Sequence, residues 1–172
     1  MHPNEAVIRR FYTAFGARDA AGMAACYHPD ILFCDPVFGE LEGAEVGAMW
    51  AMLCGRAKDL EIAFSGVSAN DAAGEAHWDA RYTFTQTGRR VLNHVDAAFG
   101  FRDGLIIRHE DLFSFWRWAR QALGPSGLLL GWTPFLHARV RAMARTGLDA
   151  YMRKAGEEKT ASRGDAESAA PH

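Results

Sequence analysis

The feature that most constrains this chain is a change in the spacing of its apolar residues near residue 60. Before that point apolar residues recur every three or four positions, as on the buried face of a helix. After it, apolar and polar residues alternate up to residue 115, as in strands with one buried face. Helices followed by strands joined through short turns predict an α+β domain, in which the helices cover one face of a sheet.

The first part of the chain is predicted to form three helices. They are expected over residues 4–17, 19–26 and 44–56, with a short strand over residues 31–36. Asp19 can cap the second helix, and the pair His28-Pro29 ends it because a residue before proline avoids helical backbone angles.

The second part is predicted to form a curved antiparallel sheet. Its strands are expected over residues 60–67, 76–84, 91–101 and 105–115. Thr87-Gly88-Arg89 and Asp103-Gly104 are turn signals that join the last three strands as hairpins.

The end of the chain carries further helical patterns and one unusually apolar segment. Helices are expected over residues 116–123 and 135–154. The segment from Leu128 to Trp132 is too apolar for a solvated loop, so it either folds over a pocket as a lid or forms a dimer contact. Residues 156–172 lack large apolar side chains and are expected to be a disordered tail.

Composition excludes several classes of protein. A chain of 172 residues with 49% hydrophobic residues fits one globular domain. Its formal net charge of −2 offers no basic field for nucleic acid. The chain has neither a signal-peptide pattern nor an apolar run near the roughly 18 residues of a membrane span, so no membrane association and a cytoplasmic location are expected. The cysteines Cys26, Cys34 and Cys54 are expected to be buried thiols.

Several segments together carry a family resemblance. They are the run from Val7 to Asp19, Tyr27-His28-Pro29-Asp30, Asp35-Pro36-Val37-Phe38-Gly39, Thr87-Gly88-Arg89, the run from Phe101 to Ile106, and the run from Arg108 to Phe115. In this order they resemble the SnoaL-like, ketosteroid isomerase-like members of the NTF2-like superfamily. The resemblance covers residues 4–118. It implies a cone-shaped NTF2-like (cystatin-like) α+β fold over residues 1–118, a pocket for a small hydrophobic molecule, and a homodimer. Residues 119–155 would then be a helical extension packed on the same domain.

The resemblance also implies candidate chemistries, of which ketosteroid isomerisation fits poorly. Asp35 stands where that family has its base. However, Phe11 occupies the place of the oxyanion-hole tyrosine, with Tyr12 beside it, and Ala97 occupies the place of the acid, with Asp96 beside it. Classical steroid isomerase activity is therefore not expected. Asp35 has an alternative role as a turn residue whose carboxylate accepts backbone N–H groups.

Limonene epoxide hydrolase-like members use an Asp-Arg-Asp arrangement, which is matched only in part. Asp111 aligns with the last-strand aspartate, and His77 and Asp79 replace the Arg-x-Asp pair, with Arg81 two residues further on. These three residues share a strand face. The alternative is that Trp78 and its aromatic neighbours face inward, which would place His77, Asp79 and Arg81 on the outer surface of the sheet.

The last strand supplies the leading candidate site. Ile107, His109, Asp111, Phe113 and Phe115 share one face, and its apolar character predicts that it points inward. His109 and Asp111 would form an acid–base pair, with Asp35 as a second carboxylate. The alternative is a buried His–Asp pair with a structural role only.

Two functions remain open. The first is a cofactor-free enzyme that carries out isomerase, hydrolase, dehydratase or cyclase chemistry on a small apolar substrate. The second is a non-catalytic ligand-binding or dimeric scaffold protein. No metal or cofactor motif is present in the sequence, and none is expected to be needed. The expected pocket-lining residues are Phe11, Tyr12, Phe15, Trp50, Phe99 and Phe113.

Overall fold

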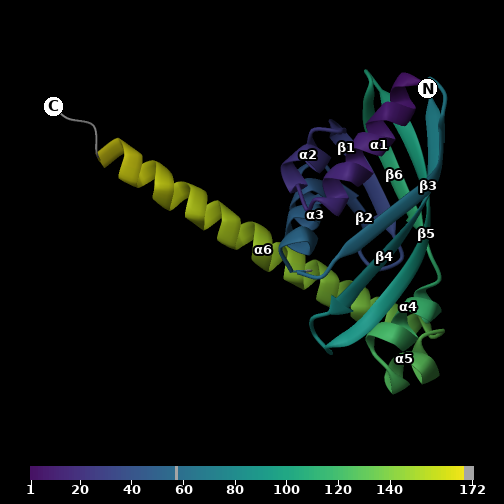
Figure 1. The fold of residues 1–172 in the computed structure, drawn as a ribbon. Coiled ribbons are helices and arrows are strands. Elements are labelled where there is room, and N and C mark those ends of the chain that lie inside the picture. The colour runs from purple at the N-terminus through teal and green to yellow at the C-terminus, as the bar shows by residue number, and fades with distance from the viewer. Residues whose placement is uncertain (57, 169–172) are drawn as a thin grey trace.

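The protein is an α+β domain, as the sequence predicts, in a computed structural model that describes residues 1–56 and 58–168 (Figure 1). The elements are α1 (Pro3–Gly16), α2 (Ala20–Ala24), β1 (Tyr27–Asp35), β2 (Gly39–Glu42), α3 (Ala44–Arg56), β3 (Glu61–Ala69), β4 (Ala73–Phe84), β5 (Arg89–Arg102), β6 (Leu105–Leu112), α4 (Phe115–Ala122), α5 (Pro125–Leu130) and α6 (Pro134–Ser168).

The strands form one curved, mixed sheet of six in the order β2-β1-β6-β5-β4-β3. All neighbours are antiparallel except β1 and β6, which run parallel. The register shifts within the β1–β6, β3–β4 and β5–β6 pairs. An extra residue on one strand bends it and increases its twist, so these irregularities help the sheet to curve around the helices.

Helices α1, α2 and α3 cover the concave face of the sheet (Figure 1). Helix α1 buries the apolar face that the sequence predicts, and Asp19 caps α2 by accepting a hydrogen bond from the Gly22 amide at 2.9 Å. Between helices and sheet lies a core rich in aromatic rings, in which Phe11, Tyr12 and Phe33 are almost fully buried. The cavity described in the next section lies against this core.

The structure differs from the sequence-based expectations in the region of β1 and β2. Strand β1 begins at Tyr27, before Pro29, and the short strand β2 was not expected. The β1–β6 register shifts between Tyr27 and Leu32, so Pro29 lies in an irregular stretch where its missing N–H breaks no regular ladder. Cys26 and Cys54 are buried as predicted, whereas Cys34 is only half-buried.

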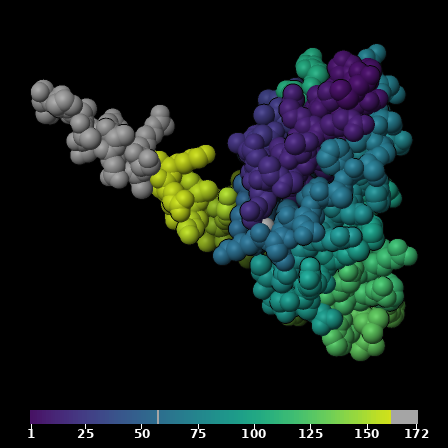
Figure 2. Space-filling view, in the orientation of Figure 1, coloured from purple at the N-terminus to yellow at the C-terminus, as the bar shows by residue number. Residues whose placement is uncertain are grey.

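The C-terminal region also differs. The apolar segment expected as a loop is largely the short helix α5, and α6 continues to Ser168, where a disordered tail was expected from residue 156. Glu, Lys, Arg and Ala, which are frequent in this part of the chain, have high intrinsic helix propensity. The low apolar content, on which the prediction of disorder rested, does not report that propensity. Residues 169–172 lie outside the described residues. Helix α6 leaves the body of the domain and projects from it (Figures 1 and 2).

Helices α4, α5 and the start of α6 cover the end of the sheet that is drawn lowest in Figure 1. Phe115, Trp118 and Leu136 form a second apolar cluster there with Val91 of β5. Gly127 allows this packing, because a Cβ atom at its position would lie 1.9 Å from the Ala119 carbonyl oxygen. Among the described helices, none combines the length and the apolar character needed to cross a membrane.

Candidate functional site

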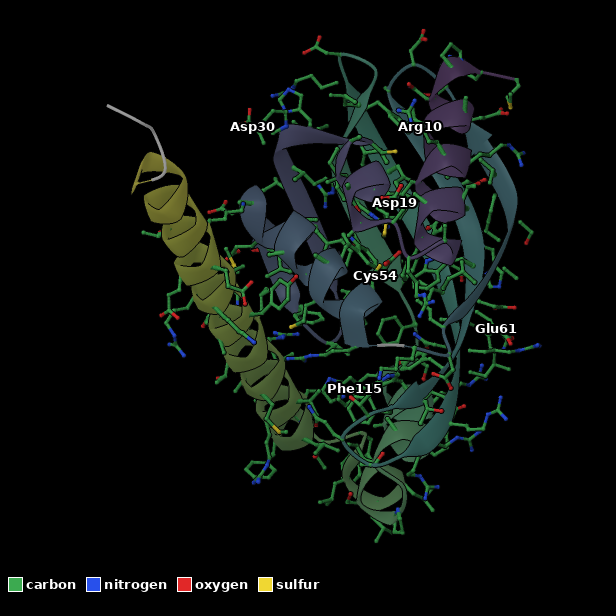
Figure 3. The ribbon with its side chains drawn as sticks, turned by 60° about the vertical axis from the view of Figure 1, so that its left-hand side comes forward. Arg10, Asp19, Asp30, Cys54, Glu61 and Phe115 are labelled. Carbon is green, nitrogen blue, oxygen red and sulfur yellow. The ribbon has the colours of Figure 1, made fainter. Side chains whose placement is uncertain are left out.

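A cavity of about 620 Å³ lies between the inner face of the sheet, α3 and the C-terminal helices. Its wall is mostly aromatic and aliphatic, with Trp50, Trp78 and Phe113 among its residues. Two carboxyl groups, from Asp35 and Asp111, belong to the same wall. Phe115, the first residue of α4, lies toward the end of the molecule that the C-terminal helices cover (Figure 3).

Asp111 is held in place by two N–H donors. It lies on β6 and is 2% exposed. Its Oδ1 atom accepts a hydrogen bond from the Trp78 indole nitrogen at 3.2 Å and another from His109 Nε2 at 3.0 Å. These two hydrogen bonds fix the position of Asp111 Oδ1 at the cavity wall.

His109 lies behind Asp111 and does not belong to the cavity wall. The Trp50 indole N–H donates to the Tyr27 hydroxyl oxygen at 2.9 Å, and that hydroxyl lies 2.7 Å from His109 Nδ1. An indole N–H can only donate, so the Tyr27 oxygen accepts a hydrogen bond from Trp50. The proton of the Tyr27 hydroxyl group is then free to be donated to His109 Nδ1. His109 then carries its own proton on Nε2 and donates it to Asp111. The chain from Trp50 through Tyr27 and His109 thus orients the carboxylate.

Aromatic rings surround this hydrogen-bonded chain. The rings of Phe11, Phe33 and Phe99 lie 5.3, 5.3 and 4.5 Å from the His109 ring. Burial raises the pKa of Tyr27 well above its usual value, and the charge of Asp111 adds to the shift. Tyr27 therefore stays protonated and keeps its role as a donor.

Asp35 combines a structural role with an unusual acidity. Its Oδ1 accepts hydrogen bonds from the backbone N–H groups of Val37, at 2.9 Å, and of Phe38. This is the turn role proposed from the sequence. Burial raises the pKa of Asp35 to about 7, with a further upward contribution from Asp111, against the lowering effect of the backbone N–H groups. At neutral pH Asp35 can therefore either donate or accept a proton.

The expected pocket-lining residues divide into two groups. Phe15, Trp50 and Phe113 line the cavity. Phe11, Tyr12 and Phe99 belong instead to the core beneath it, with 0%, 1% and 4% exposure. They lie on the predicted inner faces, but other side chains separate them from the cavity. Sequence periodicity predicts which face of an element is buried, but not how deeply each residue is buried.

Sequence reasoning missed several residues of the wall. Asn93 is a buried polar residue on β5, and Tyr82 accepts a hydrogen bond from the Trp118 indole N–H at 2.9 Å. Asn93 could have been identified from the sequence, because it is a polar residue that shares a strand face with the apolar Val91 and Val95. Leu130 and Leu136 line the cavity from the extension. The lid alternative for the segment from Leu128 to Trp132 allowed for Leu130. No sequence signal pointed to Leu136, which lies outside the segment that carries the family resemblance.

The two positions that the family resemblance assigns to an oxyanion hole hold Phe11 and Ala97, whose side chains have no polar atom. Tyr12 has a buried hydroxyl group with no hydrogen-bond partner among the described residues. Asp96 points to the opposite face of the sheet, where it pairs with His77.

The second candidate group, His77, Asp79 and Arg81, lies on the face of the sheet opposite the cavity. His77 and Asp79 are half-exposed on the outer face of β4, and Arg81 is exposed beside them. Their inward-facing neighbours Trp78 and Ala80 line the cavity. This is the second of the two alternatives for the strand, and it separates the trio from Asp111.

Comparison with known proteins gives a family match. The description of that family is "SnoaL-like domain", and its sequence profile matches residues 8–109. Among curated proteins, none matches the chain significantly in sequence.

Solved structures share the fold at low sequence identity. One is an M. tuberculosis LEH-like epoxide hydrolase, at 20% identity over 74% of this chain and 92% of that chain, with a TM-score of 0.60. Another is TerC co-crystallised with polyporic acid, at 21% identity over 65% and 92%, with a TM-score of 0.56. A third, from Catenulispora acidiphila, has a ketosteroid isomerase-like fold and is in complex with trimethylamine, at 12% identity over 74% and 97%, with a TM-score of 0.61.

Proposed function

The chain belongs to the SnoaL-like domain family, and from that premise we propose that it is a cofactor-free acid–base enzyme acting on a small, largely apolar molecule. The observation that carries the proposal is the presence of two carboxyl groups, Asp35 and Asp111, in the wall of one mostly apolar cavity. Ionisable groups with different environments in such a cavity are typical of acid–base sites.

The two carboxyl groups have different roles in this proposal. Asp111, with N–H donors on Oδ1, is the base that accepts a proton from the substrate or from water. Asp35, with a pKa of about 7, is the acid that returns a proton to another atom. Removal of one proton and addition of another is the common requirement of isomerisation, hydration, dehydration and cyclisation.

His109 is a positioning residue in this scheme. It contacts Asp111 rather than the cavity, and its Nδ1 atom faces Tyr27. Asn93 adds an amide to the wall that can hold a substrate oxygen. The apolar remainder of the wall favours a substrate with few charged groups. An epoxide hydrolase and a protein bound to polyporic acid among the structural neighbours are consistent with a substrate of this class.

The experiment incubates purified protein with steroid enones, terpene epoxides and aromatic polyketide mimics, and follows both retained ligand and product by mass spectrometry. Asp111→Asn keeps the shape of the side chain but removes the base, and turnover is expected to fall at least about 100-fold. Glu110→Gln is the matched control on the same strand, because Glu110 pairs with Arg108 outside the cavity, and its turnover is expected to equal that of wild type.

A non-catalytic ligand-binding protein is the second candidate. The observation that favours it is that Asp35 already caps a turn through two backbone N–H groups, a role that needs no chemistry. Retention of a compound without product, equal in wild type and Asp111→Asn, would establish binding alone and remove Asp111 as a base.

A further inference from the structure

A second group of histidines and aspartates lies on the outer face of the sheet, away from the cavity. Strands β4 and β5 pair in register there, with His77 opposite Asp96 and Asp79 opposite His94. The long hairpin holds these four side chains side by side on one face. The acid–base proposal does not use them.

The geometry of this group resembles the ligand set of a transition metal. His77 Nε2 lies 3.2 Å from Asp79 Oδ1, and His94 Nδ1 approaches the same oxygen atom. Ligand atoms from these three residues all lie within 4.8 Å of one another. Ligands on a tetrahedral zinc ion, each about 2.0 to 2.1 Å from the metal, are separated by about 3.3 Å. Small side-chain rotations would therefore bring the three atoms around one ion.

Asp96 supplies the feature that separates this group from an ordinary charged surface. It lies 2.9 Å from His77 Nδ1, the ring nitrogen that does not face Asp79. Metal-binding histidines usually donate the N–H of their second ring nitrogen to a carboxylate, which orients the ring and strengthens the ligand. His77 has the Asp96 carboxylate on Nδ1, and its Nε2 faces the place where the metal ion would lie.

We propose that His77, Asp79 and His94 form a surface site for a divalent transition metal ion such as Zn²⁺, with Asp96 orienting His77. Two imidazole nitrogens and one carboxylate oxygen suit zinc, copper and nickel, whereas magnesium and calcium prefer oxygen ligands alone. His77 and His94 are partly exposed, with side-chain exposures of 41% and 54%, so water can complete the coordination. The sequence analysis expected no metal, because the sequence holds no metal motif. His77 and His94 are 17 positions apart and meet only through strand pairing.

The test is a calorimetric titration of the metal-free full-length protein with Zn²⁺ at pH 7.5, together with competition against a chromophoric chelator. One zinc ion per chain is expected, with no binding of Mg²⁺ at the same concentration. Asp96→Asn is expected to lower zinc affinity about 10-fold, as removal of an orienting carboxylate does elsewhere. His77→Ala and His94→Ala remove ligands and are expected to have larger effects. The visible spectrum of the Co²⁺-loaded protein reports the same site independently.

His28→Ala is the matched control. His28 also lies near carboxylates, those of Asp30 and Asp103, but within residues 1–56 and 58–168 no second histidine joins them. Zinc affinity that is unchanged in this variant and reduced in His77→Ala and His94→Ala would support the site. Absence of zinc binding in the wild type, or equal affinity in the wild type, His77→Ala, His94→Ala and His28→Ala, would overturn it. The result is independent of the acid–base proposal, because the titration uses no substrate and the group lies on the opposite face of the sheet.

Discussion

The two faces of the sheet carry the same three-residue pattern, histidine, any residue, aspartate, with opposite consequences. On β6, the side chains of His109 and Asp111 are 0% and 3% exposed. On β4, those of His77 and Asp79 are 41% and 33% exposed. The pairs even share a similar N–O distance, 3.0 Å inside and 3.2 Å outside.

The difference between the pairs lies in their remaining partners. The inner histidine has Tyr27 on its second nitrogen, and the inner aspartate has Trp78, both from inside the core. The outer pair has Asp96 and His94 and is open to water. A His–Asp pair thus becomes an oriented carboxylate in a cavity, or a half-solvated group suited to a metal ion, according to the face on which its strand places it.

The sharpest test of this comparison is alanine substitution of each histidine. His109→Ala would leave a cavity in the aromatic core and remove the partner of the buried Tyr27 hydroxyl group. A loss of about 4 kcal/mol in the free energy of unfolding is expected. His77→Ala, in metal-free buffer, is expected to change it by no more than about 0.5 kcal/mol. Urea unfolding followed by circular dichroism measures both, and similar losses would show that burial does not separate the two pairs.

The pH dependence of stability gives the next largest effect. The folded-state pKa of Asp35 is raised to about 7, so the folded protein binds a proton there that the unfolded chain releases near pH 4. Stability should therefore fall by about 3 kcal/mol as pH rises from 4 to 7, and then level off. Asp35→Asn should remove this slope in urea unfolding curves recorded across that range.

An exposed carboxylate provides the control for that slope. The pKa of Asp59 is lowered, chiefly because the Thr83 hydroxyl group donates to it. Its contribution to stability is present above the unfolded-state pKa and is lost as pH falls below about 4. Asp59→Asn should therefore leave the slope between pH 4 and 7 unchanged. Persistence of that slope in Asp35→Asn would assign it to another group.

The smallest expected change in stability comes from removing the hydroxyl group of a buried tyrosine, which separates the effect of a hydrogen bond from that of burial. Tyr27→Phe would leave His109 Nδ1 and the Trp50 N–H without their partner, and a loss of about 2 kcal/mol is expected. Tyr12 is also buried, but its hydroxyl group has no partner among the described residues. Tyr12→Phe is therefore expected to be neutral or stabilising by about 1 kcal/mol. Thermal unfolding of the two variants would reveal the opposite signs, and equal losses would contradict the hydrogen-bonded chain.

Much of the secondary structure could be predicted because it depends on local patterns. The predicted helix over residues 44–56 coincides with α3, and Gly88 and Gly104 mark hairpin turns at positive φ angles. The prediction that strand β6 extends to residue 115 was wrong. Ser114 ends it, because its side chain accepts a hydrogen bond from the Arg117 amide and caps α4.

The candidate site could be predicted only in part. The inward face of the last predicted strand was identified from His109, Asp111 and Phe113, but Ile107 does not follow the alternation. The register shifts beside it, so that Ile106 is fully buried and Ile107 only half-buried. A bulge adds one residue to a strand and reverses the alternation beyond it, and no residue type in this segment announces one.

The sequence by itself determined the α+β class, the positions of most elements and the residue types available for chemistry, because periodicity and turn propensity act over a few residues. Only the tertiary structure decided that Asp35 and Asp111 share a cavity, that His109 supports Asp111 from behind, and that His77 meets His94 on the opposite face. Those outcomes depend on strand register, depth and the packing of distant segments, which no local pattern encodes.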